Sequence, residues 1–414
     1  MKSLIETGKD AKKASVSLSN LSTLDKNKAL IKISEELINK SQYIINENLK
    51  DIEKAEENGI KPIMIDRLRL NESRIRSMSD GIMKVAELND PIGEIINMTA
   101  SPNGLKIGKM RVPLGVIAII YEARPNVTVD AAALTLKSGN AVILRGGKEA
   151  INSNIALVNI MKNALKSVGL DENYIQLIED TSRQTATELM KLNDYVDVLI
   201  PRGGAGLIKS VIENATVNVI ETGTGNCHIY VDEDCDIEMA AEIIFNAKTQ
   251  RPSVCNAAES MVIHSKIADK ALPLIQTKLK EKEVEIKGCE RTSQIIDCTR
   301  ATNEDFYTEY LDYIISSKIV DSLDEAISHI NEHSTHHSEA IVTNNYFRAQ
   351  QFLNQIDSAA VYVNASTRFT DGYEFGLGAE IGISTQKFHA RGPMGLNELT
   401  TIKYVIYGNG QIRK

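Results

Sequence analysis

The feature that most constrains the fold of this chain is a change of pattern near residue 100. From there on, short apolar runs alternate with segments of helical periodicity. The first five runs span 115–121, 141–144, 175–178, 196–200 and 217–220. Strands that alternate with helices predict an α/β fold with a parallel sheet, whose ligands bind beyond the carboxyl ends of the strands.

A second series of apolar runs predicts a second parallel-sheet region. Its runs span 228–232, 261–264, 314–315, 340–342 and 360–364. Residues 364–398, which follow, are rich in glycine and polar side chains. Because structureless segments of this length are uncommon in compact domains, we expect this one to be functional.

The two ends of the chain have patterns of their own. Over 24–38 and 43–55, apolar residues recur at intervals of three and four, and Asn71 is placed to cap a further helix that runs to about residue 88. We therefore predict packed helices before residue 90. The segments 105–112 and 400–407 have the character of strands and are predicted to pair into an arm outside both domains.

The bulk composition limits the class of protein. A chain of 414 residues exceeds one ordinary core, so two or three domains are expected. A formal net charge of −8 argues against a nucleic-acid partner, since phosphate contacts need clustered Lys and Arg. No apolar run reaches membrane-spanning length, and the first residues lack the apolar stretch of a signal peptide. An odd count of five cysteines suits reduced thiols, so we predict a cytoplasmic protein.

Several predicted strands end in glycines and charged residues, where a nucleotide would bind. These segments span 145–148, 201–206 and 221–225. The Gly-x-Gly-x-x-Gly loop of common Rossmann dehydrogenases is absent after the first run, and the glycines at 203, 204 and 206 do not have its spacing. A cofactor, if it binds here, must be positioned by another arrangement.

Cys255 is the candidate nucleophile. It ends a polar, proline-containing segment, Gln-Arg-Pro-Ser-Val-Cys, and we expect a helix to begin just after it. A helix N-terminus favours the thiolate and so would activate the thiol. The alternative is a buried cysteine that packs as a small hydrophobe.

The order of these segments resembles the aldehyde dehydrogenase superfamily from about residue 105 to the C-terminus. The resemblance rests on blocks at 112–116, 124–126, 138–145, 202–206, 221–223, 308–311 and around Cys255. It implies two Rossmann-like parallel-sheet domains and a small oligomerisation arm of β-strands. The implied domains are a cofactor domain at 1–100 and 114–226, a catalytic domain with Cys255 at 227–364, a connecting segment at 365–385, and an arm at 101–113 and 386–414.

The same resemblance implies roles for individual residues. Asn126 falls where the family places an oxyanion donor, and Glu221 where it places the residue that activates water. Gly203 and Gly204 correspond to the loop beneath the pyrophosphate, and Glu309 to the residue that touches the nicotinamide ribose. Because a reductase must exclude water, Glu221 either assists proton transfer or only structures its loop, and both readings stay open.

Within the superfamily, one branch is especially similar, the γ-glutamyl phosphate reductases of proline biosynthesis. The similarity lies in a His-rich run at 320–341, in Tyr-Glu-Ala-Arg-Pro-Asn at 121–126, and in the segment before Cys255. It implies NADPH-dependent reduction of L-glutamyl 5-phosphate to L-glutamate 5-semialdehyde and phosphate through a Cys255 thioester. It also implies a homo-oligomer, a dimer or tetramer, and allows a transient contact with glutamate 5-kinase.

The charges of the chain suggest how its ligands are held. Arg145 and Lys148 are cations beside the expected adenosine ribose, which favours NADPH over NADH because its extra phosphate is dianionic. Arg251, Arg368 and Arg391 are candidates for the glutamyl and phosphate groups of the substrate. Each of them could equally belong to a structural ion pair.

The His-rich run needs a separate interpretation. His329, His333, His336 and His337 have helical steps, but no acidic or Cys ligand at metal spacing accompanies them, so no metal is expected. A polar cluster at a helix end or at the active-site rim is favoured.

Two other functions compete with the reductase. One is a hydrolytic or CoA-acylating aldehyde dehydrogenase that acts on a different aldehyde. The other is a redox-responsive scaffold with Cys255 as its sensing thiol, which would need no array of nucleotide and oxyanion residues.

Overall fold

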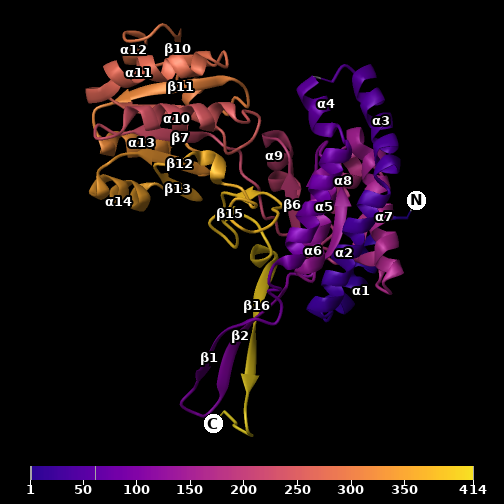
Figure 1. Ribbon diagram of the computed structural model, residues 1–414. Helices are drawn as coiled ribbons and strands as arrows, with labels where there is room; N and C mark the ends of the chain where they lie inside the picture. The colour runs from indigo at the N-terminus through magenta and orange to yellow at the C-terminus, as the bar shows by residue number, and fades with distance from the viewer. Residues whose placement is uncertain (1, 61, 414) are drawn as a thin grey trace. The chain divides into compact units, whose positions relative to one another are not determined.

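The structure is a computed structural model that describes residues 2–60 and 62–413. The described chain divides into two compact units. Unit 1 comprises Met1–Glu221, Gly376–Gly382 and Met394–Lys414, and unit 2 comprises Thr222–Phe375 and Ile383–Pro393. Each unit contains a parallel sheet with helices, which confirms the predicted fold class (Figure 1).

Unit 1 is built on a four-stranded parallel sheet, as far as its described residues go. The order is β5 (Ile175–Leu177), β4 (Ala141–Arg145), β3 (Val116–Tyr121) and β6 (Val198–Arg202). Every residue of β3 is buried, as expected of a central strand covered on both faces. The predicted run at 217–220 contributes only an isolated bridge, Val219 to Leu199.

Helices precede and connect these strands. The described residues before 90 are mainly helical as predicted, and Asn71 caps α5 by accepting the Arg74 N–H at 2.8 Å. The helices of unit 1 are α1 (Leu4–Leu18), α2 (Thr23–Asn39), α3 (Ser41–Glu57), α4 (Pro62–Leu68), α5 (Glu72–Glu87), α6 (Pro125–Lys137), α7 (Ile151–Ser167), α8 (Arg183–Leu189) and α9 (Ala205–Asn214).

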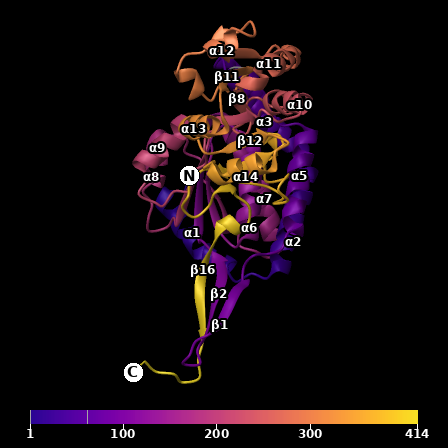
Figure 2. The same cartoon turned by 90° about the vertical axis from the view of Figure 1, so that its left-hand side faces the viewer.

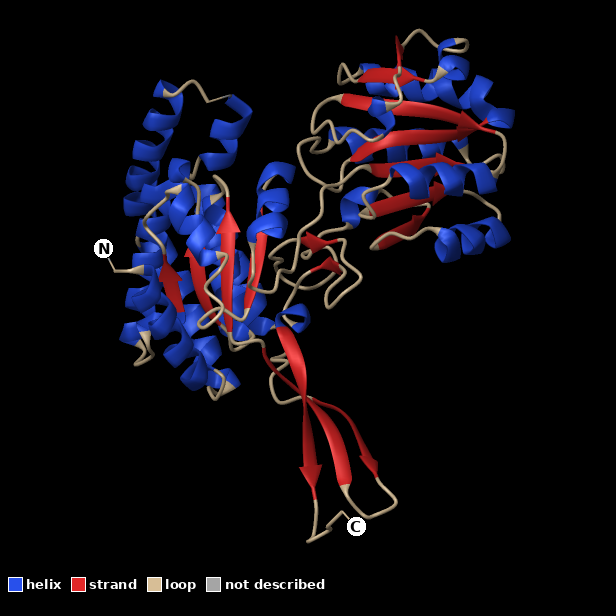
Figure 3. Cartoon of the chain, turned by 180° about the vertical axis from the view of Figure 1, so that it is seen from behind, coloured by secondary structure: helices blue, strands red, loops and turns tan. Residues whose placement is uncertain are grey.

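Three antiparallel strands of unit 1 form a separate sheet, which we call the arm (Figures 2 and 3). It comprises β1 (Ile95–Ala100), β2 (Lys106–Pro113) and β16 (Thr400–Tyr407) in that order. Thr400 pairs with Pro113 and Tyr407 with Lys106, so the predicted pairing of two distant segments is confirmed. The first strand, β1, was not predicted.

Unit 2 holds a larger parallel sheet, with seven strands within its described residues. Their order is β10 (Thr299–Arg300), β9 (Glu285–Gly288), β11 (Ile314–Val320), β8 (Ala258–His264), β7 (Cys227–Val231), β12 (Ser338–Val342) and β13 (Ala360–Val363). Two further short strands, β14 (Ile383–Ser384) and β15 (Gly392–Pro393), pair antiparallel.

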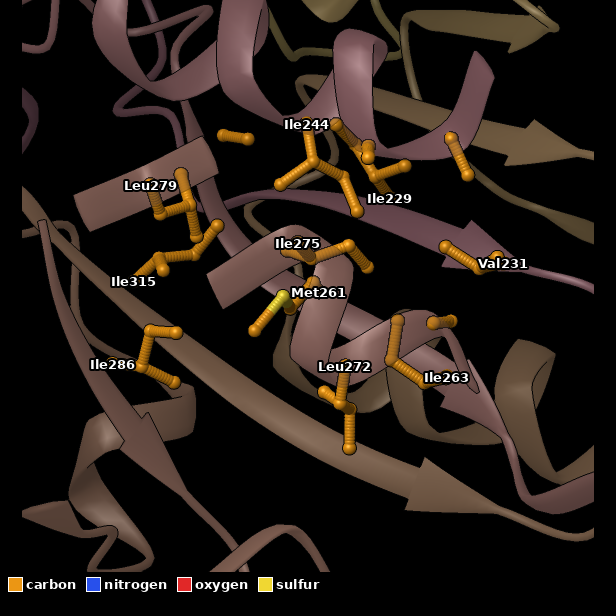
Figure 4. Packing of buried hydrophobic residues seen from close by; sticks show 14 of the residues in the cluster. Ile229, Val231, Ile244, Met261, Ile263, Leu272, Ile275, Leu279, Ile286 and Ile315 are labelled. Atoms are coloured by element: carbon orange, nitrogen blue, oxygen red, sulfur yellow. The ribbon is translucent and has the colours of Figure 1, made fainter. Parts of the chain in front are cut away.

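Successive side chains along a strand of unit 2 point to opposite faces of the sheet, and different helices pack against the two faces. In β7, Ile229 and Val231 join one buried cluster with α10 (Ile237–Thr249) and α11 (Ser265–Lys280), shown in Figure 4. Tyr230, between them, joins a second cluster with α13 (Leu323–His333) and α14 (Tyr346–Gln355). Because successive side chains point to opposite faces, β7 is covered on both sides.

Among the described residues, no helix has the length and apolar character needed to cross a membrane.

Candidate active site

Cys255 lies in a short connection of unit 2, between the end of α10 and the start of β8. The predicted helix after Cys255 is therefore wrong, because residues 258–264 form a strand. All seven residues of β8 are buried between β7 and β11, so pairing within the sheet decides their conformation. Activation of the thiol by a helix N-terminus does not apply.

Cys255 and Asn256 are the central residues of a tight turn. The Ala257 N–H donates to the Val254 carbonyl at 3.1 Å, which closes the turn around them. Cys255 itself is half-buried, whereas Asn256 is buried. The candidate nucleophile therefore lies on a closed turn at a half-buried position.

The side chain of Asn256 and its neighbours hold this turn in place. The Asn256 amide donates to the Thr370 carbonyl at 2.9 Å, and the Thr367 hydroxyl donates to the Asn256 carbonyl at 2.7 Å. Sequence reasoning missed these residues, although an amide next to a nucleophile is a signal for such a brace. Each bond limits the motion of the segment that carries Cys255.

The segment before β7 approaches the same turn. A Cβ on Gly225 would lie 1.4 Å from the Cys255 carbonyl oxygen, so only glycine fits there. The thiol of Cys227 donates to that carbonyl at 3.2 Å. Glu309, expected at the nicotinamide ribose, accepts the Gly225 N–H at 2.7 Å, and burial raises the pKa of its carboxyl.

Two of the three predicted substrate arginines lie around the turn. Arg368 donates from Nε to the Gln250 side chain at 2.9 Å and also donates to the Asn256 side chain. Burial lowers the pKa of Arg368, the charge of Asp371 opposes this shift, and the charge of the exposed Arg251 adds to it. Two guanidinium groups close to a half-buried thiol form an environment that favours an anion.

The third predicted arginine, Arg391, has a different partner. Its guanidinium contacts the Asp357 carboxylate at 2.8 Å, and Lys387 contacts the same carboxylate. Both arginine and carboxylate are partly exposed, as in an ordinary surface ion pair.

A buried ion pair supports β8 beside the candidate nucleophile. The Lys248 ammonium contacts the Glu259 carboxylate at 2.5 Å, and both side chains are fully buried. The other carboxylate oxygen of Glu259 accepts the Leu311 N–H at 3.2 Å. Burial raises the pKa of Glu259 and lowers that of Lys248. Such a pair is costly to break because one charge would be left unpartnered.

In unit 1, the candidate cofactor residues gather where the strand order reverses. From β3 the chain proceeds to β4 and β5 and then returns to β6 on the other side of β3. Gly203 and Gly204 follow β6, and Glu122 follows β3. In open parallel sheets, this switch point is where ligands bind.

The residues at the switch point fit a dinucleotide phosphate. The Gly204 N–H, at the start of α9, donates to the Glu122 carboxylate at 3.1 Å. A Cβ on Gly203 would lie 2.7 Å from the carboxyl carbon of Glu122. The backbone here thus already binds an anionic group, which is the chemistry that a pyrophosphate needs.

Arg145 and Lys148 follow β4 on the same edge of the sheet. The Arg145 guanidinium donates to the carbonyls of Thr181 at 2.6 Å and Ser182 at 3.1 Å. Its Nε is buried without a hydrogen-bond partner among the described residues, and burial lowers its pKa. Lys148 is exposed. A donor left unpaired beside an exposed cation fits an anionic ligand.

The remaining predicted site residues belong to unit 1. Asn126 lies in the first turn of α6, and its amide donates to the Asp130 carboxylate at 3.2 Å. Burial raises the pKa of Asp130 to about 6. Glu221 is half-buried and is the last residue of the first segment of unit 1, whereas Cys255 belongs to unit 2.

The histidine cluster is aromatic and partly buried, since His333 and His337 are buried whereas His329 and His336 are half-buried. The rings of His329 and His333, on α13, are 4.1 Å apart, and His329 packs edge-on against Phe306 at 5.3 Å. Burial lowers the pKa of His329 to about 3. α13 ends at His333, so His336 and His337 do not extend its face. Within the described residues, no three His, Cys, Asp or Glu side chains are grouped to hold a metal.

Comparison with known proteins identifies the family of the chain. The sequence profile of the aldehyde dehydrogenase family matches residues 3–295, and the chain belongs to that family. A gamma-glutamyl phosphate reductase of Clostridium perfringens (strain SM101 / Type A) is 64% identical over 411 residues, 99% of each chain. A second, from Caldicellulosiruptor bescii, is 60% identical over 419 residues, 100% of each chain.

Within that family, the chain belongs with the gamma-glutamyl phosphate reductases. The crystal structure of the gamma-glutamyl phosphate reductase from Thermotoga maritima matches it with a TM-score of 0.97 and 51% identity, over 100% of both chains. The family resemblance drawn from the sequence is confirmed.

Proposed function

We propose that this protein reduces L-glutamyl 5-phosphate to L-glutamate 5-semialdehyde and phosphate, with NADPH as the reductant and a thioester on Cys255 as the intermediate. The observation that carries the proposal is the braced turn that presents a half-buried thiol beside Arg251 and Arg368. The names of the relatives support the substrate.

The first half of the reaction transfers the acyl group. The Cys255 thiolate attacks the γ-carbonyl carbon, a C–S bond forms, and the C–O bond to phosphate breaks. Arg251 and Arg368 stabilise the departing phosphate. The Cys255 N–H is one donor to the oxyanion, and we assign the second to Asn126, as the family resemblance implies.

The second half releases the aldehyde. When bound, the nicotinamide supplies a hydride to the thioester carbon. This leaves the carbonyl oxygen as an alkoxide. The alkoxide re-forms the C=O bond, the C–S bond breaks, and the aldehyde leaves while the sulfur takes up a proton. Glu221 is the candidate for this proton transfer. Splitting the reduction in two avoids attack of hydride on a free acyl phosphate.

Two features of unit 1 would hold the cofactor. The α9 N-terminus with Gly203 and Gly204 suits the pyrophosphate, and Glu122 must then yield the Gly204 N–H. Arg145 and Lys148 suit the 2′-phosphate, which favours NADPH. We also keep Glu309 as a ribose candidate.

The arm is the proposed contact between copies of the chain. Several of its apolar side chains are exposed: Ile95, Ile96, Met98, Ile402, Tyr404 and Ile406. An exposed apolar strand is unfavourable in a monomer, so a second copy would cover it. Light scattering should give a dimer or tetramer, and Tyr404→Glu should shift the mass toward the monomer.

The reverse reaction tests the proposed chemistry. Glutamate 5-semialdehyde and NADP⁺ are supplied with and without phosphate, to the wild type and to Cys255→Ala. Phosphate-dependent formation of NADPH that is lost in the variant supports the proposal. Turnover without phosphate would instead identify a hydrolytic enzyme, and turnover that needs CoA a CoA-acylating one.

A further inference from the structure

The backbone carbonyl of Cys255 is held by an element distant in sequence. It points at the segment that enters β7, where Gly225 leaves room for it and Cys227 donates to it. Cys227 pairs with Ala258, the first residue of β8, so the strands on both sides of the contact are joined within the sheet. The contact between Cys227 and the Cys255 carbonyl therefore lies where two paired strands of the sheet begin.

The carbonyl of Cys255 belongs to the central peptide of its turn. Cys255 and Asn256 occupy the two central positions, and rotation of the peptide between them interconverts the common turn types. The other type needs a positive φ at the third position, which Asn tolerates better than most residues. Asn256 is not among the described residues with positive φ, so the turn is in the form that directs the carbonyl to Cys227.

Cys227 is suited to act as a donor there. Its side chain is fully buried, and burial together with the charge of Glu339 raises the pKa of the thiol well above its usual range. It therefore stays protonated and keeps the hydrogen that it donates. The His337 Nδ1 lies 3.7 Å from the same sulfur.

We propose that Cys227 is a positioning residue, whose thiol holds the Cys255 carbonyl and so prevents the peptide between Cys255 and Asn256 from rotating. This inference rests on the proposed role of Cys255 as nucleophile. Rotation would change ψ of Cys255 and hence the direction of its sulfur relative to the acyl group. A nucleophile must meet the carbonyl carbon at a narrow range of distance and angle, so the bond acts on the rate of acylation.

Three substitutions separate the donated bond from the packing of the side chain. Cys227→Ala removes the donor and leaves a small cavity, whereas Cys227→Val removes the donor and fills the site with an apolar side chain slightly larger than cysteine. Cys227→Ser keeps a donor at the same place. Cys235→Ala is the control, since Cys235 is half-buried in the same unit and packs against the cluster around α10 and α11.

Two readouts are measured on the purified full-length protein. One is the rate at which iodoacetamide alkylates Cys255, followed by peptide mass spectrometry. The other is kcat and KM for glutamate 5-semialdehyde in the phosphate-dependent reaction. We expect Cys227→Ala and Cys227→Val to lower both the alkylation rate and kcat about tenfold, with KM within about twofold. Cys227→Ser should recover most of each, and Cys235→Ala should match the wild type.

The possible results distinguish this inference from the proposed function. Unchanged alkylation and kcat in a folded Cys227→Val protein would overturn the positioning role and leave Cys255 as nucleophile. A lower melting temperature with wild-type alkylation would overturn it equally, because packing alone would then be affected. If Cys255→Ala retains phosphate-dependent turnover, the proposed function fails, while slower alkylation of Cys255 in the Cys227 variants would still support the hydrogen bond.

Discussion

The Glu309 carboxylate accepts the backbone N–H of Gly225 at 2.7 Å. Gly225 in turn lies against the Cys255 carbonyl, so Glu309 acts on the nucleophile's turn through one glycine. The family resemblance implies a different task for Glu309, contact with the nicotinamide ribose. The two tasks have different kinetic consequences.

Substitutions of Glu309 distinguish contact with Gly225 from contact with the nicotinamide ribose. If the contact with Gly225 dominates, Glu309→Ala should lower kcat about tenfold with little change in KM for NADP⁺, and Glu309→Gln should retain most activity because its amide oxygen still accepts. A rise in KM for NADP⁺ in both variants, with kcat unchanged, would favour ribose binding. Both constants are measured by steady-state kinetics, with the NADP⁺ concentration varied at saturating phosphate.

Gly225 should not tolerate a side chain. A Cβ there would overlap the Cys255 carbonyl oxygen, so Gly225→Ala must displace the turn, and we expect kcat to fall more than about 100-fold. Gly81→Ala is the matched control, because Gly81 lies within α5 with open space around it. That variant should keep full activity and gain about 0.5–1 kcal/mol of stability. Wild-type kcat in Gly225→Ala would contradict the close approach.

Arg251 should matter for phosphate. Arg251→Ala is expected to raise KM for phosphate about tenfold in the reverse reaction, because the anion would lose a charged donor. Arg300→Ala is the control, since Arg300 is exposed and pairs with Glu290 in the same unit. An equal effect of both variants would mean that overall charge, rather than a specific contact, attracts the anion.

Lys148 should influence the choice between the two nicotinamide cofactors. Lys148→Glu places an anion where the 2′-phosphate is proposed, so the ratio of kcat/KM for NADP⁺ to that for NAD⁺ should fall on the order of 30-fold. We prefer this residue to Arg145, whose guanidinium also holds the carbonyls of Thr181 and Ser182. A ratio unchanged from the wild type would remove Lys148 from the cofactor site.

Acid should destabilise the protein through His329. Burial lowers its pKa to about 3 in the folded state, while the unfolded chain binds the proton near the ordinary value of about 6.5. The unfolded state therefore binds more protons between these values, and stability falls as the pH drops below about 6.5, by about 1.4 kcal/mol for each pH unit.

His329→Phe should remove part of this dependence, because phenylalanine keeps the aromatic packing against Phe306 without a titrating group. The measurement is the shift in melting temperature between pH 7.5 and pH 5.5 for the variant and the wild type. Equal shifts would show that other groups, such as His333, whose pKa burial also lowers, cause the acid sensitivity.

Features that depend on local periodicity were predicted well from the sequence. The alternation of apolar runs with helical segments correctly predicted the parallel sheets, and Asn71 correctly predicted the start of a helix. The pairing of 105–112 with 400–407 was also predicted, because two strands without neighbours in either domain have few other partners. Even so, the length of β8 was misjudged, and the helix expected after Cys255 is a central strand.

The sequence by itself therefore determined the family, the fold class and the identity of the candidate nucleophile, because each follows from residue types and their spacing along the chain. Only the tertiary structure decided how the nucleophile is held. Gly225, Cys227 and Thr367 contact the turn of Cys255 directly. Glu309 acts on it through Gly225, so three separate segments of the chain hold the turn. Such contacts depend on strand order and on the close approach of backbones in the packed sheet, and no local pattern encodes them.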